Sequence, residues 1–323
     1  MIEAIRLRAP GGPEQLQRTR IELAAPAAGE IRVRHSAIGV NFLDVYQRMG
    51  LYPLEPSAIP GVEAVGTVVA TGAGVDGIKP GDRIVYAGAP VGAYAGERNL
   101  PAWRAVRLPG GLDDAAVAST FLKGITAQML LSRVHPVAAG TLVLVHSAAG
   151  GLGRLLTRWA AERGATVVGT VGSEVKAEVA RAAGAHHVIV GRDADFAGEL
   201  VAWSGGRKAD VAYDGVGGET LRRTLDCVRP FGVVASIGQA GGPIPPLDVT
   251  ELGPRRSLML ARPSVMGFVN NAEDYHRAAG VVLAALAAGV LGGAGRAYPL
   301  AEAARAHGDL ESGKTSGALY LVP

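Results

Sequence analysis

The chain has 323 residues, of which 48% are hydrophobic and 5% aromatic, with 46 glycines, 19 prolines and one cysteine. This length and composition predict a globular protein of two domains and exclude fibrous and disordered classes. The formal net charge of +3 comes from dispersed arginines and not from a basic run interleaved with aromatic residues, which argues against a nucleic-acid partner.

The single cysteine, Cys227, can form neither an internal disulfide nor a multi-cysteine zinc site, so a reducing cytoplasm is the expected setting. The first residues, MIEAIRLRAPGG, contain no apolar signal core. The most apolar stretch starts at Ala278 and is too short to span a bilayer, so we interpret it as a packed helix. We therefore expect a cytoplasmic protein without a membrane partner.

Residues 1–122 contain short runs that are typical of strands, among them EIRVRHSAIGV and EAVGTVVATG, with turn pairs such as the PG of KPGDRIVY between them. Sustained helical spacing is scarce in this part of the chain. These patterns predict a compact β-rich first domain.

From about residue 125 the pattern changes. The short apolar runs TLVLVHS, ATVVGTV, HHVIV, ADVAYDG and GVVASIG predict strands, and GRLLTRWAAERG and EVKAEVARAAG predict helices between the early ones. Alternating strands and helices predict a parallel, doubly wound sheet, which we place at residues 123–267.

A sixth strand is predicted near SLMLARPSVMG, followed by a helix at 272–290, a short helix and a final strand. We assign residues 268–323 to the first domain, so that both ends of the chain complete it. The connections are short, which predicts two tightly joined lobes with a cleft between them.

The stretch VHSAAGGLGRLL lies directly after one predicted strand and directly before a helix. Ala148, Gly150 and Gly153 match the G-x-G-x-x-G pattern with alanine at its first position. Such a turn lets the backbone approach a pyrophosphate, which binds the free amides of the helix N-terminus. The turn predicts a dinucleotide site; the alternative, an ordinary glycine-rich turn, is disfavoured by the strands and helices that follow.

The end of the next strand, GTVGSEVK, lacks the usual acidic residue that selects NAD. Gly172 and Ser173 are small and uncharged, and Lys176 follows one helical turn later, so a 2′-phosphate would meet space and a cation. We therefore predict NADP(H) over NAD(H). The preference would weaken if Glu174 pointed inward, and a solvated surface charge is the alternative interpretation of Lys176.

The segments GVNFLDVYQRMGLYP, PGVEAVGTV, KPGDRIVY, FLKGITAQ and SAAGGLG occur in the order found in medium-chain dehydrogenases and reductases. From GGPEQL to ESGKTSG, nearly its whole length, the chain closely resembles the zinc-free NADPH:quinone oxidoreductases, the zeta-crystallin-like branch. The resemblance implies an α/β fold with a GroES-like β-barrel catalytic domain and a Rossmann cofactor domain. It also implies a homodimer joined through the edges of the Rossmann sheets.

In the zinc alcohol dehydrogenases a metal-binding cysteine stands where this chain has Asn41, and a metal-binding histidine stands where it has Val62. No other cysteine can compensate, so we expect no catalytic zinc. Without a metal, the site should favour an acceptor that takes hydride readily and then needs only a proton. A quinone or a conjugated carbonyl compound fits that description.

The resemblance assigns four residues to the catalytic side of the site: Asn41, Asp44, Tyr46 and Tyr52. It places the first three beside the nicotinamide and lets the two tyrosines line the acceptor. Structural roles are the alternatives, namely a turn for Asn41, a helix start for Asp44 and rim packing for the tyrosines.

The resemblance also implies cofactor contacts from both predicted domains. They are Asn41, Tyr46, Thr126, Ala149, Gly150, Gly151, Leu152, Gly153, Gly172, Ser173, Lys176, Arg192, Gly238, Gln239, Ala240, Gly241, Ser264, Val265, Met266 and Lys314. Residues 238–241 would run beside the nicotinamide ribose, and residues 264–266 would form a strand at the nicotinamide amide. For Lys314, a solvated tail lysine is the alternative.

The chain departs from many relatives at VIVGR, where Gly191 replaces a tyrosine that packs near the adenosine phosphate. We therefore expect Arg192 and Lys176 to bind the 2′-phosphate together, with less aromatic shielding.

These features predict a zinc-independent NADPH:quinone oxidoreductase. An NADPH-dependent reductase of enones or enoyl thioesters is the alternative within enzymes, because both reactions deliver hydride to a conjugated acceptor. A non-catalytic NADPH-binding structural or RNA-binding protein is the alternative from another class. The intact turn and the lack of a basic stripe argue against it.

Overall fold

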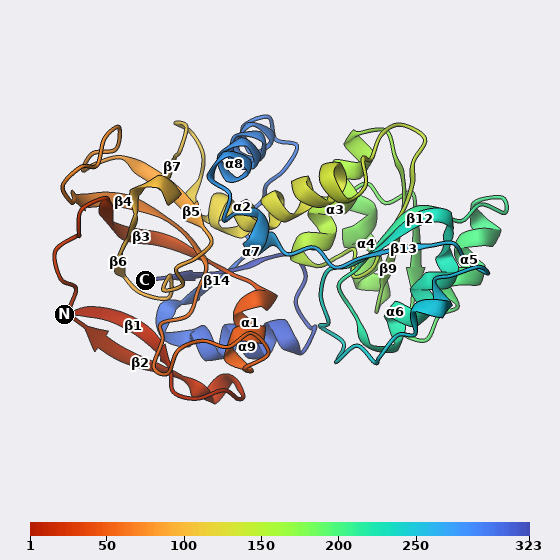
Figure 1. The fold of residues 1–323 in the computed structure, drawn as a ribbon, viewed down its shortest axis with the longest axis horizontal. Helices are drawn as coiled ribbons and strands as arrows, with labels where there is room; N and C mark the ends of the chain where they lie inside the picture. Colours follow the sequence, from red (N-terminus) through yellow and green to blue (C-terminus); the bar gives the residue numbers. More distant parts are fainter. The chain divides into compact units, whose positions relative to one another are not determined.

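The computed structural model describes residues 1–323. The chain divides into two compact units, one formed by Met1–Ile125 with Met266–Pro323 and the other by Thr126–Val265. Figure 1 shows that each unit is built around its own sheet. Two helices cross the division along the chain, α2 (Asp114–Met129) and α7 (Val265–Phe268).

A seven-stranded sheet forms the first unit, in the order β14-β15-β3-β4-β5-β7, with β6 paired to β3. The central strand β3 (Glu30–Val40) pairs with β4, β6 and β15. Its alternate residues Ile31, Val33 and His35 are buried, as expected for a strand with one face on the core. The other strands of this sheet are β4 (Glu63–Thr71), β5 (Arg83–Ala87), β6 (Glu97–Pro101), β7 (Val106–Arg107), β14 (Arg296–Pro299) and β15 (Leu319–Val322).

The C-terminal residues complete this unit, because β15 pairs with β3 with Leu319 opposite Val40. A separate hairpin pairs β1 (Ile2–Leu7) with β2 (Leu16–Ile21). Three further helices belong to the unit: α1 (Phe42–Arg48), α8 (Ala272–Ala287) and α9 (Ala303–Glu311). The apolar stretch from Ala278 lies in α8, whose Ala278, Val282 and Leu286 are buried, so it is a packed helix as predicted.

The second unit is a parallel sheet of six strands in the order β10-β9-β8-β11-β12-β13. The strands are β8 (Leu142–Val145), β9 (Thr166–Val171), β10 (His187–Val190), β11 (Ala209–Asp214), β12 (Val228–Ser236) and β13 (Met259–Ala261). The strand order reverses between β8 and β11, and ligands of doubly wound sheets bind outside the carboxyl ends of the strands at such a point.

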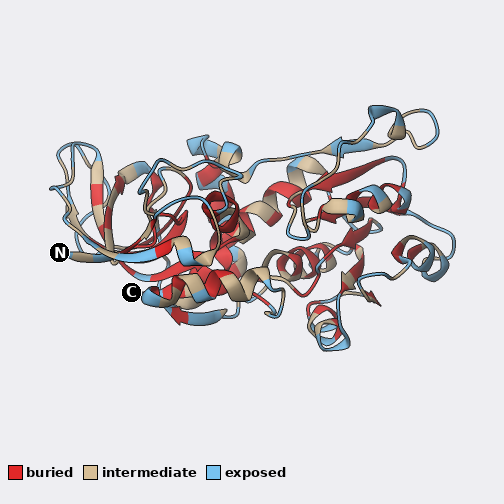
Figure 2. Cartoon of the chain, turned by 90° about the horizontal axis from the view of Figure 1, so that it is seen from below, coloured by how far each residue is buried: buried red, intermediate tan, exposed pale blue.

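Helices cover both faces of the parallel sheet. One face carries Leu144 and Val168, which form a cluster with Phe196 of α5 (Phe196–Trp203) and Leu221 of α6 (Gly218–Thr224). The helices α3 (Gly151–Glu162) and α4 (Glu174–Ala182) pack along β8, β9 and β10. Figure 2 shows buried residues along the strands and exposed residues on the outer helical surfaces and loops.

The structure confirms the predicted α/β fold, with a GroES-like first unit and a Rossmann second unit. The prediction of a strand at residues 264–266 is wrong. The strand β13 ends at Ala261, Pro263 offers no amide donor to continue it, and the chain turns into α7 at Val265. No helix combines the length and the apolar character needed to cross a bilayer.

Candidate functional site

The glycine-rich turn connects β8 to α3 as predicted. Ser147 has a φ of +53°, and the amide of Gly150 donates to its carbonyl oxygen at 2.8 Å. A Cβ at Gly153 would lie 2.2 Å from that carbonyl oxygen, so only glycine lets the helix approach the turn this closely. The close approach explains the last glycine of the pattern.

The N-terminus of α3 is open to an anion. Gly150 occupies the N-cap and provides no side-chain hydrogen bond, and the first turn contains no acidic residue. The early amides of a helix need acceptors, and a phosphate oxygen is a suitable one. Around this N-terminus lie five of the predicted cofactor residues: Ala149, Gly150, Gly151, Leu152 and Gly153.

Two cations flank the end of β9. A Cβ at Gly172 would lie 3.8 Å from Nε of Arg192, an ordinary contact distance, so the guanidinium lies beside this glycine. Partial burial lowers the pKa of Lys176, and the nearby charge of Arg192 lowers it further. Ser173 is the N-cap of α4 with no side-chain cap hydrogen bond. Gly172, Ser173, Lys176 and Arg192 thus form one small, positively charged corner of the second unit.

The orientation of Glu174, which the sequence left open, is outward. Its carboxylate accepts a hydrogen bond from Arg181 at 2.8 Å, and 66% of the side chain is exposed. Gly191, which replaces the tyrosine of many relatives, has a φ of +122°. A tyrosine would be strained in this backbone conformation, which glycine adopts freely.

The loops after β11 and β12 lie against each other. The amides of Ala240 and Gly241 donate to the carbonyl oxygens of Gly215 and Val216 at 3.1 and 2.7 Å. A Cβ at Gly217, whose φ is +70°, would lie 2.7 Å from Cα of Gln239. Gly238 and Gln239 are therefore held with Ala240 and Gly241 at the carboxyl ends of the strands.

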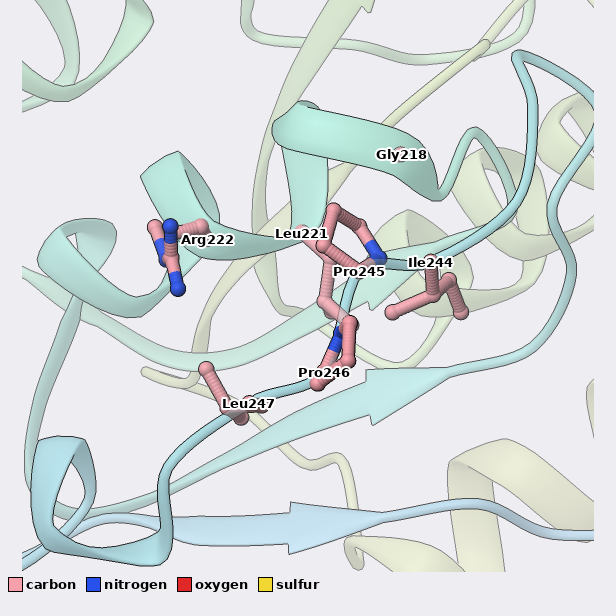
Figure 3. A pocket seen from close by; sticks show the side chains of 7 residues that line it. All are labelled: Gly218, Leu221, Arg222, Ile244, Pro245, Pro246 and Leu247. Carbon is pink, nitrogen blue, oxygen red and sulfur yellow. The ribbon is translucent and has the colours of Figure 1, made fainter.

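A shallow pocket follows this loop and is no acceptor site. Figure 3 shows Ile244, Pro245 and Pro246 opposite Gly218 and Leu221 of α6. The cavity has a volume of about 10 Å³, enough for one water molecule. Pro245 and Pro246 restrict the backbone of the segment that lines this pocket.

In the first unit, Asn41 is fixed by a buried carboxylate that the sequence analysis missed. Asn41 is the N-cap of α1, and its Nδ2 donates to Oε1 of Glu63 at 2.9 Å. The other oxygen of Glu63 accepts from the amide of Leu122 at 2.8 Å, and Nζ of Lys123 lies 3.6 Å from Oε1. These donors fix the orientation of the Asn41 amide.

Asp44 caps the start of α1 from inside. Its Oδ2 accepts from the amide of Asn41 at 2.8 Å and from the hydroxyl of Tyr94 at 3.2 Å. Nε2 of His307 lies 2.9 Å from the same hydroxyl. Complete burial, reinforced by the negative charge of Glu63, raises the pKa of Asp44 to about 7.

The two predicted tyrosines lie together. Their rings meet edge to face with centroids 5.8 Å apart, and Tyr46 is 9% exposed whereas Tyr52 is 42% exposed. Tyr52 is therefore the more exposed of the two, and its ring packs against that of Tyr46.

The remaining predicted residues lie on three other segments of the chain. Thr126 is the first residue of the second unit and lies within α2. Ser264 directly precedes α7, and Val265 and Met266 are the first residues of that helix, so none of the three lies in a strand. Lys314 is exposed between α9 and β15.

His146 is a second residue that the sequence analysis did not assign to the site. It directly follows β8, and its ring nitrogens lie 2.9 Å from the hydroxyls of Thr170 and Thr224. Burial lowers its pKa, so the ring is neutral at neutral pH. The position of His146 next to the glycine-rich turn could have indicated that it lies near the site. Its two threonine partners could not be predicted, because they are 24 and 78 residues away in the sequence.

The residues do not fit a catalytic zinc. Asn41 and Val62 stand at the ligand positions, and no group of three or more His, Cys, Asp or Glu side chains is arranged to hold a metal ion.

Two family models match the chain, the "Alcohol dehydrogenase GroES-like domain" at residues 27–121 and the "Zinc-binding dehydrogenase" at residues 151–284. The 2-haloacrylate reductase of a Burkholderia species is 40% identical over 331 residues, covering 100% of this chain and 99% of the relative. Quinone oxidoreductase 1 of Escherichia coli is 39% identical over 329 residues, covering 100% of both chains.

A crystal structure of Escherichia coli quinone oxidoreductase complexed with NADPH superposes with a TM-score of 0.96 at 39% identity. The match covers 99% of this chain and 100% of that chain. The chain therefore belongs to the quinone oxidoreductase branch of the medium-chain dehydrogenase/reductase superfamily.

Proposed function

We propose that this protein is a zinc-independent NADPH:quinone oxidoreductase. The observation that carries the proposal is the positively charged corner formed by Lys176 and Arg192, from which Glu174 turns away to Arg181. A 2′-phosphate would gain two cations there, whereas an NAD ribose would find no carboxylate to bind. The relation to NADPH-bound quinone oxidoreductase supports the same cofactor.

The residues present fit this cofactor. The α3 N-terminus would hold the pyrophosphate, and the loop at residues 238–241 would lie along the nicotinamide ribose. NADPH supplies the hydride when it is bound. Asn41, fixed by Glu63, and the pair Tyr46 and Tyr52 would orient the acceptor, since alignment is the main requirement for transfer to an easily reduced acceptor.

A second candidate is the reduction of a conjugated alkene by NADPH. Its support is the 40% identity to a 2-haloacrylate reductase, an identity close to that of the quinone oxidoreductases. Both reactions deliver hydride to a conjugated carbonyl compound, so the same cofactor corner serves either acceptor.

NADPH-oxidation kinetics over an acceptor panel test the proposal. We expect 1,4-benzoquinone and 9,10-phenanthrenequinone to give higher kcat/KM than crotonyl-CoA, small enones and 2-chloroacrylate. The opposite order would establish the alkene reductase instead. Tight NADPH binding without oxidation by any acceptor would favour a non-catalytic structural role, and electron spin resonance would detect a semiquinone if electrons passed singly.

A homodimer through the edge of the parallel sheet is part of the proposal. The edge strand β13 leaves Met259 52% and Leu260 37% exposed, on opposite faces of the strand. Substitution Met259→Lys should shift the mass measured by light scattering from dimer to monomer; a wild-type monomer would contradict the proposal.

A cytoplasmic location is also proposed, and the state of the single cysteine supports it. Cys227 is unpaired and buried, and burial raises its pKa to about 12. A buried, protonated thiol is compatible with a reducing compartment and gives the fold no dependence on oxidation. Fractionation of the source cells with antibody detection would locate the protein, and recovery outside the cytoplasm would contradict the proposal.

A further inference from the structure

Arg104 is a buried cation whose hydrogen-bond partners are all uncharged. It ends a short helical turn, Ala102–Arg104, and is 3% exposed. Its guanidinium donates to the carbonyl oxygens of Val269 at 2.6 Å and Ala87 at 3.3 Å, and to Oδ1 of Asn270 at 2.8 Å. A charge removed from water in this way needs compensation from its surroundings.

Two aromatic rings supply part of that compensation. The guanidinium carbon lies 4.0 Å from the ring centroid of Trp103 and 5.7 Å from that of Tyr275. The hydroxyl of Tyr275 donates to the carbonyl oxygen of Arg104 at 2.8 Å and accepts from the amide of Ala87 at 3.1 Å. The two rings themselves meet edge to face with centroids 6.2 Å apart, so the arginine is held by adjacent aromatic rings and along its backbone, a setting suited to its planar fork.

The backbone beside Arg104 is shaped around the guanidinium. Gly88 has a φ of +106°, and a Cβ there would lie 2.6 Å from Nη1 of Arg104. Any larger residue at position 88 would displace the guanidinium of Arg104, so this position of the arginine requires glycine at residue 88.

The residues that Arg104 holds have a particular place in the chain. The chain passes from the second unit to the first between Val265 and Met266. Val269 and Asn270 follow directly after α7, and Asn271 then caps α8 by accepting from the amide of Asp274 at 2.9 Å. Arg104 thus fixes the chain immediately after it has returned from the cofactor-binding unit.

We infer that Arg104 is a positioning residue for cofactor binding, which anchors the returning chain so that Ser264, Val265 and Met266 are presented to the nicotinamide amide. The inference rests on the proposed function, which assigns those three residues to the cofactor. An anchor a few residues away limits the positions that such a short segment can adopt, and loss of alignment lowers affinity or rate.

Arg98 provides the matched control. It is also a buried arginine of the first unit, 7% exposed, that donates to the carbonyl oxygens of Pro90 at 3.0 Å and Asn99 at 3.2 Å. Its guanidinium lies 5.4 Å from the ring centroid of Tyr86. Arg98 therefore resembles Arg104 in burial and bonding but holds only barrel segments.

The test compares Arg104→Met, Asn270→Ala and Arg98→Met in the full chain. Melting temperature, NADPH dissociation constant by fluorescence, KM for NADPH and kcat are measured for each. We expect Arg104→Met to raise the NADPH dissociation constant and KM about tenfold with a much smaller change in kcat, because misplaced binding groups cost affinity. Asn270→Ala removes one acceptor at an exposed residue and should move the same constants in the same direction by less.

Arg98→Met should lower the melting temperature and leave the NADPH dissociation constant unchanged. An unchanged constant in both Arg104→Met and Asn270→Ala, or an equal rise in Arg98→Met, would overturn the inference. If Arg104→Met does not fold, Asn270→Ala decides. If the wild-type protein does not bind NADPH, the proposed function and this inference are both overturned. If it binds NADPH but reduces no quinone, the proposed function is overturned, and the NADPH dissociation constants of the variants still test the role of Arg104.

Discussion

Substitution Asp44→Asn should change how the stability of the protein depends on pH. Burial raises the pKa of this carboxyl from 3.8 to about 7, so the folded protein favours the neutral form. Between these values the unfolded chain releases the proton while the folded protein keeps it. The stability that Asp44 contributes is therefore fully present below about pH 4 and is lost as pH rises through about 7.

The size of the loss follows from the shift. Each pKa unit corresponds to about 1.4 kcal/mol, and the rise from 3.8 to about 7 therefore gives ~4 kcal/mol as the total change. Asparagine keeps an oxygen that can accept from the amide of Asn41 but cannot ionise. Relative to wild type, the variant should become more stable by up to ~4 kcal/mol as pH rises from about 4 to about 8.

Urea unfolding of both proteins over this pH range measures the difference in free energy of unfolding. His35 and His307, whose pKa values burial lowers to about 4 and about 3, titrate in both proteins with the opposite effect on stability, so the difference isolates Asp44. Asp82→Asn is the contrasting control. Backbone and Arg107 hydrogen bonds lower the pKa of Asp82, so its contribution is lost as pH falls. A difference between wild type and Asp44→Asn that does not vary with pH would refute the reasoning.

Three further substitutions test the site. Lys176→Ala should lower the ratio of kcat/KM for NADPH over NADH about tenfold or more, because one charge-assisted phosphate contact is lost. Lys208→Ala, at an exposed lysine of the same unit, should leave this ratio unchanged. If the ratio is the same in the two variants, the cofactor assignment is contradicted. Glu63→Gln places an amide donor against either Asn41 or the Leu122 amide, so kcat/KM for the quinone should fall about tenfold, and unchanged kinetics would show that Asn41 needs no such anchor. Gly191→Tyr should lower the free energy of unfolding by about 1–3 kcal/mol, since residue 191 has a φ of +122°, and a variant as stable as wild type in urea would mean that the loop relaxes.

The strands were predictable where the pattern is local. The run EIRVRHSAIGV alternates apolar and polar residues and coincides with β3, and the glycine-rich turn lies between β8 and α3 as its spacing requires. The strand predicted at residues 264–266 failed because the resemblance carried over a strand that Pro263 and the helical α7 replace. Resemblance to a family predicts the order of the secondary-structure elements along the chain better than it predicts the local backbone conformation.

The partners of the site residues were not predictable from spacing. Asn41 meets Glu63 from 22 residues away, and Tyr94 meets His307 from 213 residues away. Only the folded first unit, in which the C-terminal strand β15 pairs with β3, brings these side chains together. The motifs predicted candidate site residues, and the fold decides which of them are held in one orientation.

The charges around Asn41 show how the barrel manages without a metal at this position. A metal ion would offset the negative charge of neighbouring carboxylates, and here the Lys123 ammonium lies 3.6 Å from Glu63 while Asp44 is kept neutral by its burial up to about pH 7. Two carboxyl groups around one asparagine are thus tolerated: Glu63, which lies beside a cation, and Asp44, which holds its proton. The charges around Asn41 are thus balanced by the Lys123 ammonium and by the proton on Asp44, without a contribution from a metal ion.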